Sequence, residues 1–188
     1  GIGLNALYAN TTADHNVAIG TAALDANTTG DNNIGIGNNA SGAITTGNRN
    51  IAIGSNSLAS NTVGDRNIAV GMGALNAFAP TGNVDSYNVA VGYDAGNDLT
   101  TGIQNTAVGG LALDAATTAD ANTAVGYWAL TASTTGANNV ALGANAGQAI
   151  TTGGSHVLIG VNAGDALTEA NFNVALGRNA LSADTLGS

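Results

Sequence analysis

Cysteine and lysine are absent from this sequence of 188 residues, and proline occurs only once. Without cysteine the chain can form neither a disulfide framework nor a thiolate metal site. Its two histidines, His15 and His156, are too far apart in the sequence to suggest a metal-binding motif. We therefore expect no metal site and no cofactor.

Charge is equally scarce, at 8% of the residues with a net charge of −9, and the only fixed cations are Arg49, Arg66 and Arg178. A nucleic-acid partner would require a face of several cations to neutralise phosphates, so none is expected. No apolar run approaches the roughly 18 residues of a membrane-spanning helix, and the first residues lack a signal-peptide pattern. We therefore predict no membrane insertion.

Catalytic signatures are also missing. The glycines do not form a phosphate-binding loop, and the aspartates do not follow the repeat of calcium-binding β-rolls. Asp94 with Asp98 is the nearest suggestion of a catalytic carboxylate pair. We expect a protein that is not an enzyme.

Glycine, in contrast, is abundant at 28 residues, and much of it is periodic. The phrase Asn-x-Ala-x-Gly recurs along the chain, and its final position defines eleven copies, separated by 17 residues in nine steps and by 21 in one. These aligned glycines are Gly3, Gly20, Gly37, Gly54, Gly71, Gly92, Gly109, Gly126, Gly143, Gly160 and Gly177. A fixed short period indicates stacked structural units.

Each unit contains a short alternating segment such as Val17-Ala18-Ile19, which is typical of a strand. We therefore predict an all-β fold, a parallel β-solenoid of eleven 17-residue repeats, one of which carries a four-residue insertion. Residues 1–188 form a single array. In the predicted register, Val17 and Ile19 fill the interior, whereas Ala18 and its counterparts face outward.

Two further columns exchange large and small side chains. Four residues after the aligned glycine, seven copies have leucine, and the others have Ser41, Gly96, Gly147 and Gly164. Three residues later the same four copies carry Ile44, Leu99, Ile150 and Leu167. Because a close-packed interior penalises both voids and surplus side chains, the two positions are predicted to share one internal space. The alternative is two repeat subtypes that arose by duplication without a packing constraint.

Polar residues also form columns. The residue that opens each strand is His156 in one copy and asparagine in the others, namely Asn16, Asn33, Asn50, Asn67, Asn88, Asn105, Asn122, Asn139 and Asn173. Stacked asparagine amides can bond from coil to coil, and a threonine column beginning at Thr11 is predicted to form a second structural ladder. Glycines such as Gly30 suit a turn with positive φ, and aspartates such as Asp14 suit local bonds to the backbone.

The phrases Asn50-Ile-Ala-Ile-Gly54, Asn139-Val-Ala-Leu-Gly143 and Asn173-Val-Ala-Leu-Gly177 resemble the YadA-like head repeats of trimeric autotransporter adhesins. The 17-residue form with Thr-Thr-Gly resembles arrays in phage and bacterial tail-fibre proteins, although adhesin repeats are usually shorter. The resemblance covers all eleven copies. It implies a left-handed β-roll that assembles as a parallel homotrimer. It also implies a structural role in reach and attachment on a virion or bacterial surface.

Self-association is also indicated by two alanine columns, one containing Ala18 and the other Ala6, because flat columns of small side chains allow close approach. The alternative is that these alanines fit narrow corners of the solenoid. Both ends of the sequence fall within a repeat, which predicts a segment of a longer fibrous chain that forms a homotrimer or a filament.

The insertion supplies the candidate binding loop, with Phe78, Pro80, Asp85 and Tyr87 as its candidate residues for a cell-surface receptor or a glycan. The alternative is a tolerated insertion whose Phe78 plugs the loop from beneath. Tyr93, Tyr127 and Trp128 could stack on sugars but are interpreted as surface decoration. A competing function is ice binding by a threonine array, although adjacent threonines such as Thr28-Thr29 would point to opposite faces.

Overall fold

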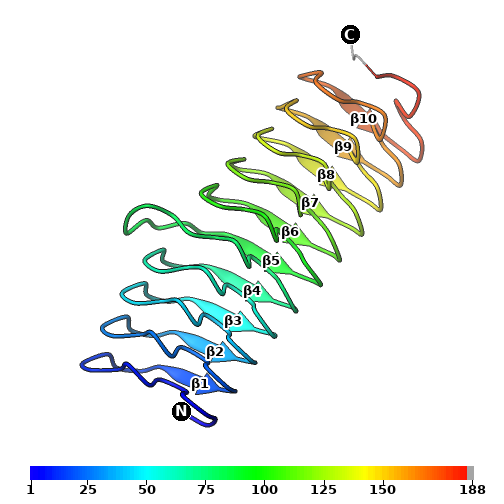
Figure 1. The fold of residues 1–188 in the computed structure, drawn as a ribbon. Coiled ribbons are helices and arrows are strands. Elements are labelled where there is room, and N and C mark those ends of the chain that lie inside the picture. The colour runs from blue at the N-terminus through cyan, green and yellow to red at the C-terminus, as the bar shows by residue number, and fades with distance from the viewer. Residues whose placement is uncertain (186–188) are drawn as a thin grey trace.

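The computed structural model describes residues 1–185, a range that contains ten short strands and no helix. The strands are β1 (Val17–Ile19), β2 (Ile34–Ile36), β3 (Ile51–Ile53), β4 (Ile68–Val70), β5 (Val89–Val91), β6 (Thr106–Val108), β7 (Thr123–Val125), β8 (Val140–Leu142), β9 (Val157–Ile159) and β10 (Val174–Leu176). Each strand pairs in parallel with the next, so the sheet follows the order of the sequence (Figure 1). The predicted parallel β-solenoid is confirmed, up to the last three residues of the predicted array, which lie outside the described range.

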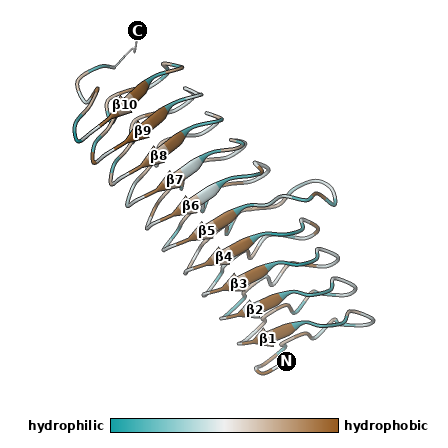
Figure 2. Cartoon of the chain, turned by 180° about the vertical axis from the view of Figure 1, so that it is seen from behind, coloured by the Kyte–Doolittle hydropathy of each residue, from teal (hydrophilic) through white to brown (hydrophobic). Residues whose placement is uncertain are grey.

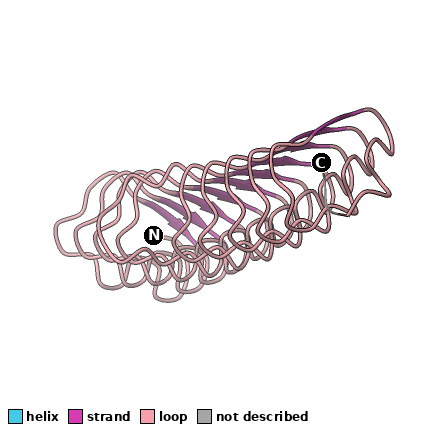
Figure 3. Cartoon of the chain, turned by 90° about the horizontal axis from the view of Figure 1, so that it is seen from above, coloured by secondary structure: helices cyan, strands magenta, loops and turns pink. Residues whose placement is uncertain are grey.

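One coil corresponds to one repeat, because Val17 pairs with Ile34 and Ile34 pairs with Ile51. The first copy adds only an isolated bridge between Ile2 and Ile19. Strand occupies one side of each coil, and loops and turns make up the rest (Figure 3). With a spacing of about 4.8 Å between neighbouring strands, the nine steps from β1 to β10 span roughly 43 Å.

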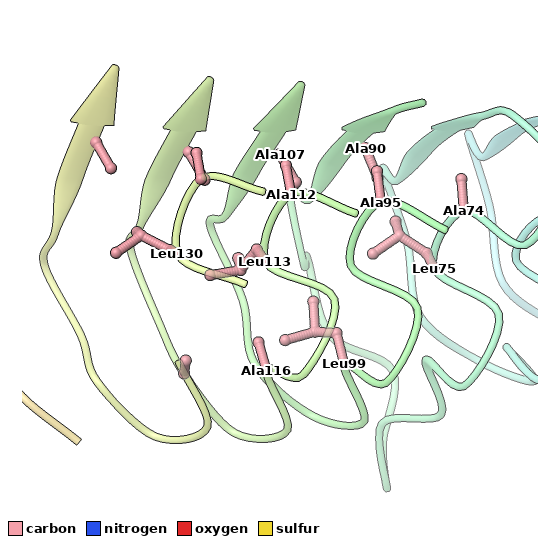
Figure 4. Packing of buried hydrophobic residues seen from close by; sticks show 14 of the residues in the cluster. Ala74, Leu75, Ala90, Ala95, Leu99, Ala107, Ala112, Leu113, Ala116 and Leu130 are labelled. Carbon is pink, nitrogen blue, oxygen red and sulfur yellow. The ribbon is translucent and has the colours of Figure 1, made fainter. Parts of the chain in front are cut away.

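The strands present the opposite faces from those predicted. Ala18 is 2% exposed, whereas Val17 and Ile19 on either side of it are 44% and 39% exposed. Ala52 and Ala69 are likewise buried, and Ile53 is 38% exposed. The coil interior is already filled by leucine and isoleucine from the return segment, so the centre of each strand has room for little more than a methyl group (Figure 4).

Both alanine columns therefore lie inside the solenoid and cannot form a contact between subunits. Ala23, Ala74 and Ala112 of the second column are fully buried, as Ser57 is in its place. The alternative interpretation, that alanine fits narrow corners, is the correct one. The argument for self-association from the alanines is wrong, and the exposed apolar columns are those of valine and isoleucine.

The predicted exchange of volume agrees with the packing. Side chains from both positions are fully buried, including Leu24 and Leu58 from one and Ile44 and Leu99 from the other. A Cβ placed on Gly147 would lie 3.0 Å from Cδ1 of Ile150, 2.9 Å from Cδ1 of Leu158 and 2.8 Å from Cδ2 of Leu130. Leu158 replaces the usual alanine at the centre of β9, so three positions, not two, share the interior.

Backbone conformation explains why glycine replaces leucine in this exchange. The position has positive φ in every described copy, for example 51° at Leu75, 49° at Ser41 and 62° at Gly147. Glycine adopts this conformation without the steric penalty of a side chain. In copies where the large side chain stands three residues later, glycine at the first of the two positions therefore takes up the least volume and causes the least backbone strain.

Glycines elsewhere are required by the approach of the next coil. The aligned Gly109 has a φ of 135°, and a Cβ there would lie 2.5 Å from the carbonyl oxygen of Gly126. Gly30, predicted to need positive φ, does not have it. A Cβ on Gly30 would instead press on the carbonyl of Gly47 and lie 2.7 Å from Oδ1 of Asn27.

The shared interior predicts a graded response to substitution. Gly147→Leu should lower the free energy of unfolding by about 1–3 kcal/mol, because the added side chain competes with Ile150 and Leu158. Adding Ile150→Asn should recover part of this loss, and Leu158→Ala should recover more, because the triple variant reproduces the composition around Leu58. Denaturant unfolding followed by circular dichroism measures each step, and strictly additive effects would contradict shared space.

Ser41 offers a stabilising change. Its hydroxyl is buried and has no hydrogen-bond partner among residues 1–185, and its φ of 49° is unfavourable for a residue with a side chain. Ser41→Gly removes both penalties and should raise the free energy of unfolding by about 1 kcal/mol. Thr62→Gly is the control at an exposed position of ordinary φ, where glycine should destabilise. A Ser41→Gly protein that melts below the wild type would contradict this account.

Candidate functional site

The asparagines that open the strands form a continuous ladder inside the solenoid. Oδ1 of Asn105 accepts the backbone N–H of Asn122 at 3.0 Å, and Nδ2 of Asn105 donates to the carbonyl of Ala119 at 2.7 Å. This amide thus joins its coil to the next with both of its polar atoms, whereas Nδ2 of Asn67 donates to Asn50 Oδ1 of the preceding coil at 3.0 Å. Asn88 N–H donates to Asn67 Oδ1 at 3.3 Å, so the ladder also crosses the insertion.

His156 reproduces the bonding of the asparagine that it replaces. Its Nε2 lies 2.7 Å from the carbonyl oxygen of Ala170, and its Nδ1 accepts the backbone N–H of Asn173 at 3.2 Å. This pattern requires a neutral ring with the proton on Nε2, because a protonated ring has no acceptor. Burial lowers the pKa of His156 below its ordinary value of 6.5. The side chain is a ladder residue, as the sequence indicated, whereas His15 is exposed in another column.

The threonine column that begins at Thr11 is a second ladder. The hydroxyl of Thr28 donates to the carbonyl of Thr45 at 3.0 Å, and that of Thr100 donates to the carbonyl of Thr117 at 2.9 Å. The threonines that follow these residues are solvent-exposed and form what is called here the exposed threonine column. Its members are Thr12, Thr29, Thr46, Thr101, Thr118, Thr135 and Thr152.

Aspartates beyond the turn bond between coils, not locally as predicted. Oδ1 of Asp31 accepts the backbone N–H of Asp14 at 2.7 Å, and Oδ1 of Asp65 accepts that of Asn48 at 2.7 Å. The partner lies one coil earlier in each case. Sequence reasoning missed this because the local bond and the bond between coils require the same residue types.

The insertion forms a longer loop ahead of β5 that extends beyond the neighbouring coils (Figure 1). Two of its candidate residues, Phe78 and Pro80, are buried. A Cβ on Gly64 would lie 3.0 Å from Cε1 of Phe78 and 2.9 Å from Cγ of Pro80, so both rings pack on the preceding coil. They hold the loop down, as the alternative interpretation of Phe78 proposed, and present no surface to a ligand.

Asp85 and Tyr87 remain at the surface and meet Arg66. The guanidinium of Arg66 forms an ion pair with the Asp85 carboxylate and lies 5.6 Å from the centroid of the Tyr87 ring. The loop returns to the coil here, where Asp65 N–H donates to the carbonyl of Val84 at 2.9 Å. Arg66 was missed as a site residue, and the only signal for it was that it is one of three cations in the chain.

The other candidate groups lie apart from this loop. Tyr127 and Trp128 stack with ring centroids 5.0 Å apart and are partly exposed, as is Tyr93. Asp94 accepts a bond from Asn97 Nδ2 at 3.1 Å and raises the pKa of Tyr93 through a hydrogen bond and its charge. The pKa of Asp114 is raised chiefly by burial, and the negative charge of Asp98 raises it further. The two carboxylates suggested as a pair thus have different neighbours.

The outer sheet face, defined as the first and third residues of every strand, extends along the described solenoid. Of these twenty residues, eighteen are valine, isoleucine or leucine, two are threonine and none is charged. Figure 2 shows the strands as an almost continuous apolar band, with β6 and β7 paler. At about 43 Å by 10 Å, the strip covers on the order of 400 Å², the size of patch that often marks an interaction site.

Within residues 1–185, no pocket opens in the surface and no three side chains are grouped to hold a metal ion. The same range contains no helix long and apolar enough to cross a membrane.

The ladder histidine predicts a pH dependence. Below about pH 6.5 the unfolded chain binds a proton at His156, whereas the folded chain binds it less readily because its His156 has a lower pKa. The free energy of unfolding should therefore fall on acidification. Above that pH the ring is neutral in both states and no penalty applies. His156→Asn restores the ladder residue and should remove this component. Unfolding curves of the two proteins between pH 8 and pH 5 should diverge below about pH 6.5, by at most about 1.4 kcal/mol per pH unit, and parallel curves would contradict the prediction.

Comparison of the chain with protein-family models, with curated proteins and with solved structures gives no match in any of the three. The functional assignment therefore depends on the geometry of the solenoid and its surfaces.

Proposed function

We propose that this β-solenoid repeat protein is a structural segment of a fibre or adhesin on a virion or bacterial surface. It assembles as a parallel homotrimer through the outer sheet face and has no catalytic role. The observation that carries this proposal is the outer sheet face itself, an uncharged apolar strip along the described solenoid.

The exposed side chains of this face account for its tendency to associate. Val17, Val91 and Val140 each keep more than a third of their surface in contact with water. Removing apolar surface from water contributes about 25 cal/mol per Å², so burial of this face against a partner would contribute a favourable free energy of association. Charged residues make up only 8% of the chain, and none of them lies on this face.

The repeat favours a second copy of the chain as the occupant. Side chains on the face recur at about 4.8 Å along the solenoid, so a partner must present matching ridges at the same spacing over its whole length. Another copy does so automatically. A rotation axis parallel to the solenoid closes such an assembly without leaving an open end, and the resemblance to trimeric adhesin heads supports three subunits.

Reach and attachment complete the proposal. A solenoid joined by hydrogen bonds at every coil is a stiff spacer, and a projecting loop on a rigid scaffold suits receptor contact. Tyr87 and Asp85, exposed beside Arg66, are the proposed contacts for a receptor or glycan. The ice-binding alternative would have to use the exposed threonine column alone, because the ladder hydroxyls, such as that of Thr28, donate to backbone carbonyls.

Light scattering and native mass spectrometry test the assembly. The chain should behave as a trimer of its 18.1 kDa subunit at micromolar concentration. Ile53→Lys with Val91→Lys places two charges on the outer sheet face and should reduce the assembly to monomers. Thr46→Lys with Thr101→Lys adds the same charge on the exposed threonine column and should leave the trimer intact. A folded wild-type monomer would refute the proposal, as would equal effects of the two pairs of substitutions.

A further inference from the structure

Two polar residues interrupt the outer sheet face, and both lie near its middle. Thr106 opens β6 and Thr123 opens β7, where the other eight strands have valine or isoleucine. The two are neighbours across the sheet, because Thr106 pairs with Thr123. The third residue of every strand is apolar without exception. The face therefore has one polar band, two coils wide, in an otherwise apolar strip (Figure 2).

Neither hydroxyl of this polar band contributes a hydrogen bond to the described solenoid. The ladder threonines donate to the carbonyl one coil on, as Thr117 does to Thr134 at 3.1 Å, whereas the side chains of Thr106 and Thr123 make no hydrogen bond within residues 1–185. Valine has the same shape as threonine and would suit the strand equally well. The structure of the single chain thus gives no reason for threonine at either position.

We infer that Thr106 and Thr123 set the register and direction of self-association, an inference that rests on the proposed assembly through the outer sheet face. In a parallel, in-register assembly, each threonine meets its own counterpart at the same height. Hydroxyls that lose contact with water can then bond to one another, since each is both donor and acceptor. Any other parallel alignment buries at least one of them against an apolar side chain.

The position of the polar band discriminates among alignments. In register, both levels match. A slip of one coil pairs Thr106 with Thr123 but places the other threonine of each chain against Val89 or Val140. An antiparallel alignment end to end places Thr106 opposite Val89 of β5 and Thr123 opposite Ile68 of β4, so neither level matches. An antiparallel alignment matches both threonine levels only when the chains are offset by two coils, which leaves β1 and β2 of each chain without a partner strand. A uniformly apolar strip with a 17-residue repeat would distinguish these alignments poorly. The two threonines would act as a polar residue does in an apolar coiled-coil seam, where it specifies the register.

Distances between spin labels test this inference. The chain has no cysteine, so Thr29→Cys on the exposed threonine column creates a unique labelling site away from the face. Pulsed electron resonance on the assembled wild-type background should give one narrow distribution of distances between subunits. With Thr106→Val and Thr123→Val the oligomer should persist, but the distribution should broaden to include slipped registers, offset by steps of about 4.8 Å along the axis, and antiparallel pairs.

The matched control moves the band without removing it. Thr106→Val and Thr123→Val combined with Val140→Thr and Val157→Thr keeps the composition and should restore the narrow distribution, because among parallel alignments the two threonine levels again match only in register. A narrow distribution in the doubly substituted oligomer would overturn the inference, as would failure of the control to restore it. A wild-type chain that gives no distance between subunits would overturn the proposed assembly as well, which separates the two failures.

Discussion

Stacking of equivalent coils at about 4.8 Å is the constraint on which the rest of the structure depends. Each column must be compatible with itself, because the residue above a side chain is generally its counterpart 17 positions away. Asparagine satisfies this condition with one donor and one acceptor, and His156 can replace it because its neutral ring has both. A column of like charges would repel itself, which is consistent with a chain that is only 8% charged.

The same constraint limits the interior. A coil of 17 residues encloses a narrow space, and the return segment places one leucine or isoleucine in it at each level. The strand can then contribute only a small side chain, and the exceptions show how closely the volumes are balanced. Where Leu158 occupies the centre of β9, glycine stands at both 147 and 164, and their added Cβ atoms would lie 2.9 Å and 2.8 Å from its methyl groups.

The period, the strands, the ladders and the shared internal space could all be predicted from the sequence, because each appears as a column at fixed spacing. The orientation of the strands could not be obtained from alternation alone, since Val17-Ala18-Ile19 has the same period whichever face is buried. We assumed that the larger apolar residues point inward, and the opposite follows from the leucine already inside. Glycine at 147 and 164 on either side of Leu158 was the available signal. The Arg66–Asp85 ion pair depends on how the insertion folds, and no column records that.

Burial in this solenoid therefore differs from burial in a globular domain. With a leucine or isoleucine of the return segment already inside, the centre of a strand has little room for a β-branched residue, so the residues best suited to the strands face outward. The insertion leaves that face unchanged, because Ile68 still pairs with Val89 across it and the extra residues enter ahead of the strand. A change in the length of the turn consequently does not alter the outer sheet face. A chain built this way can vary the length of its projecting loop while its outer sheet face stays the same.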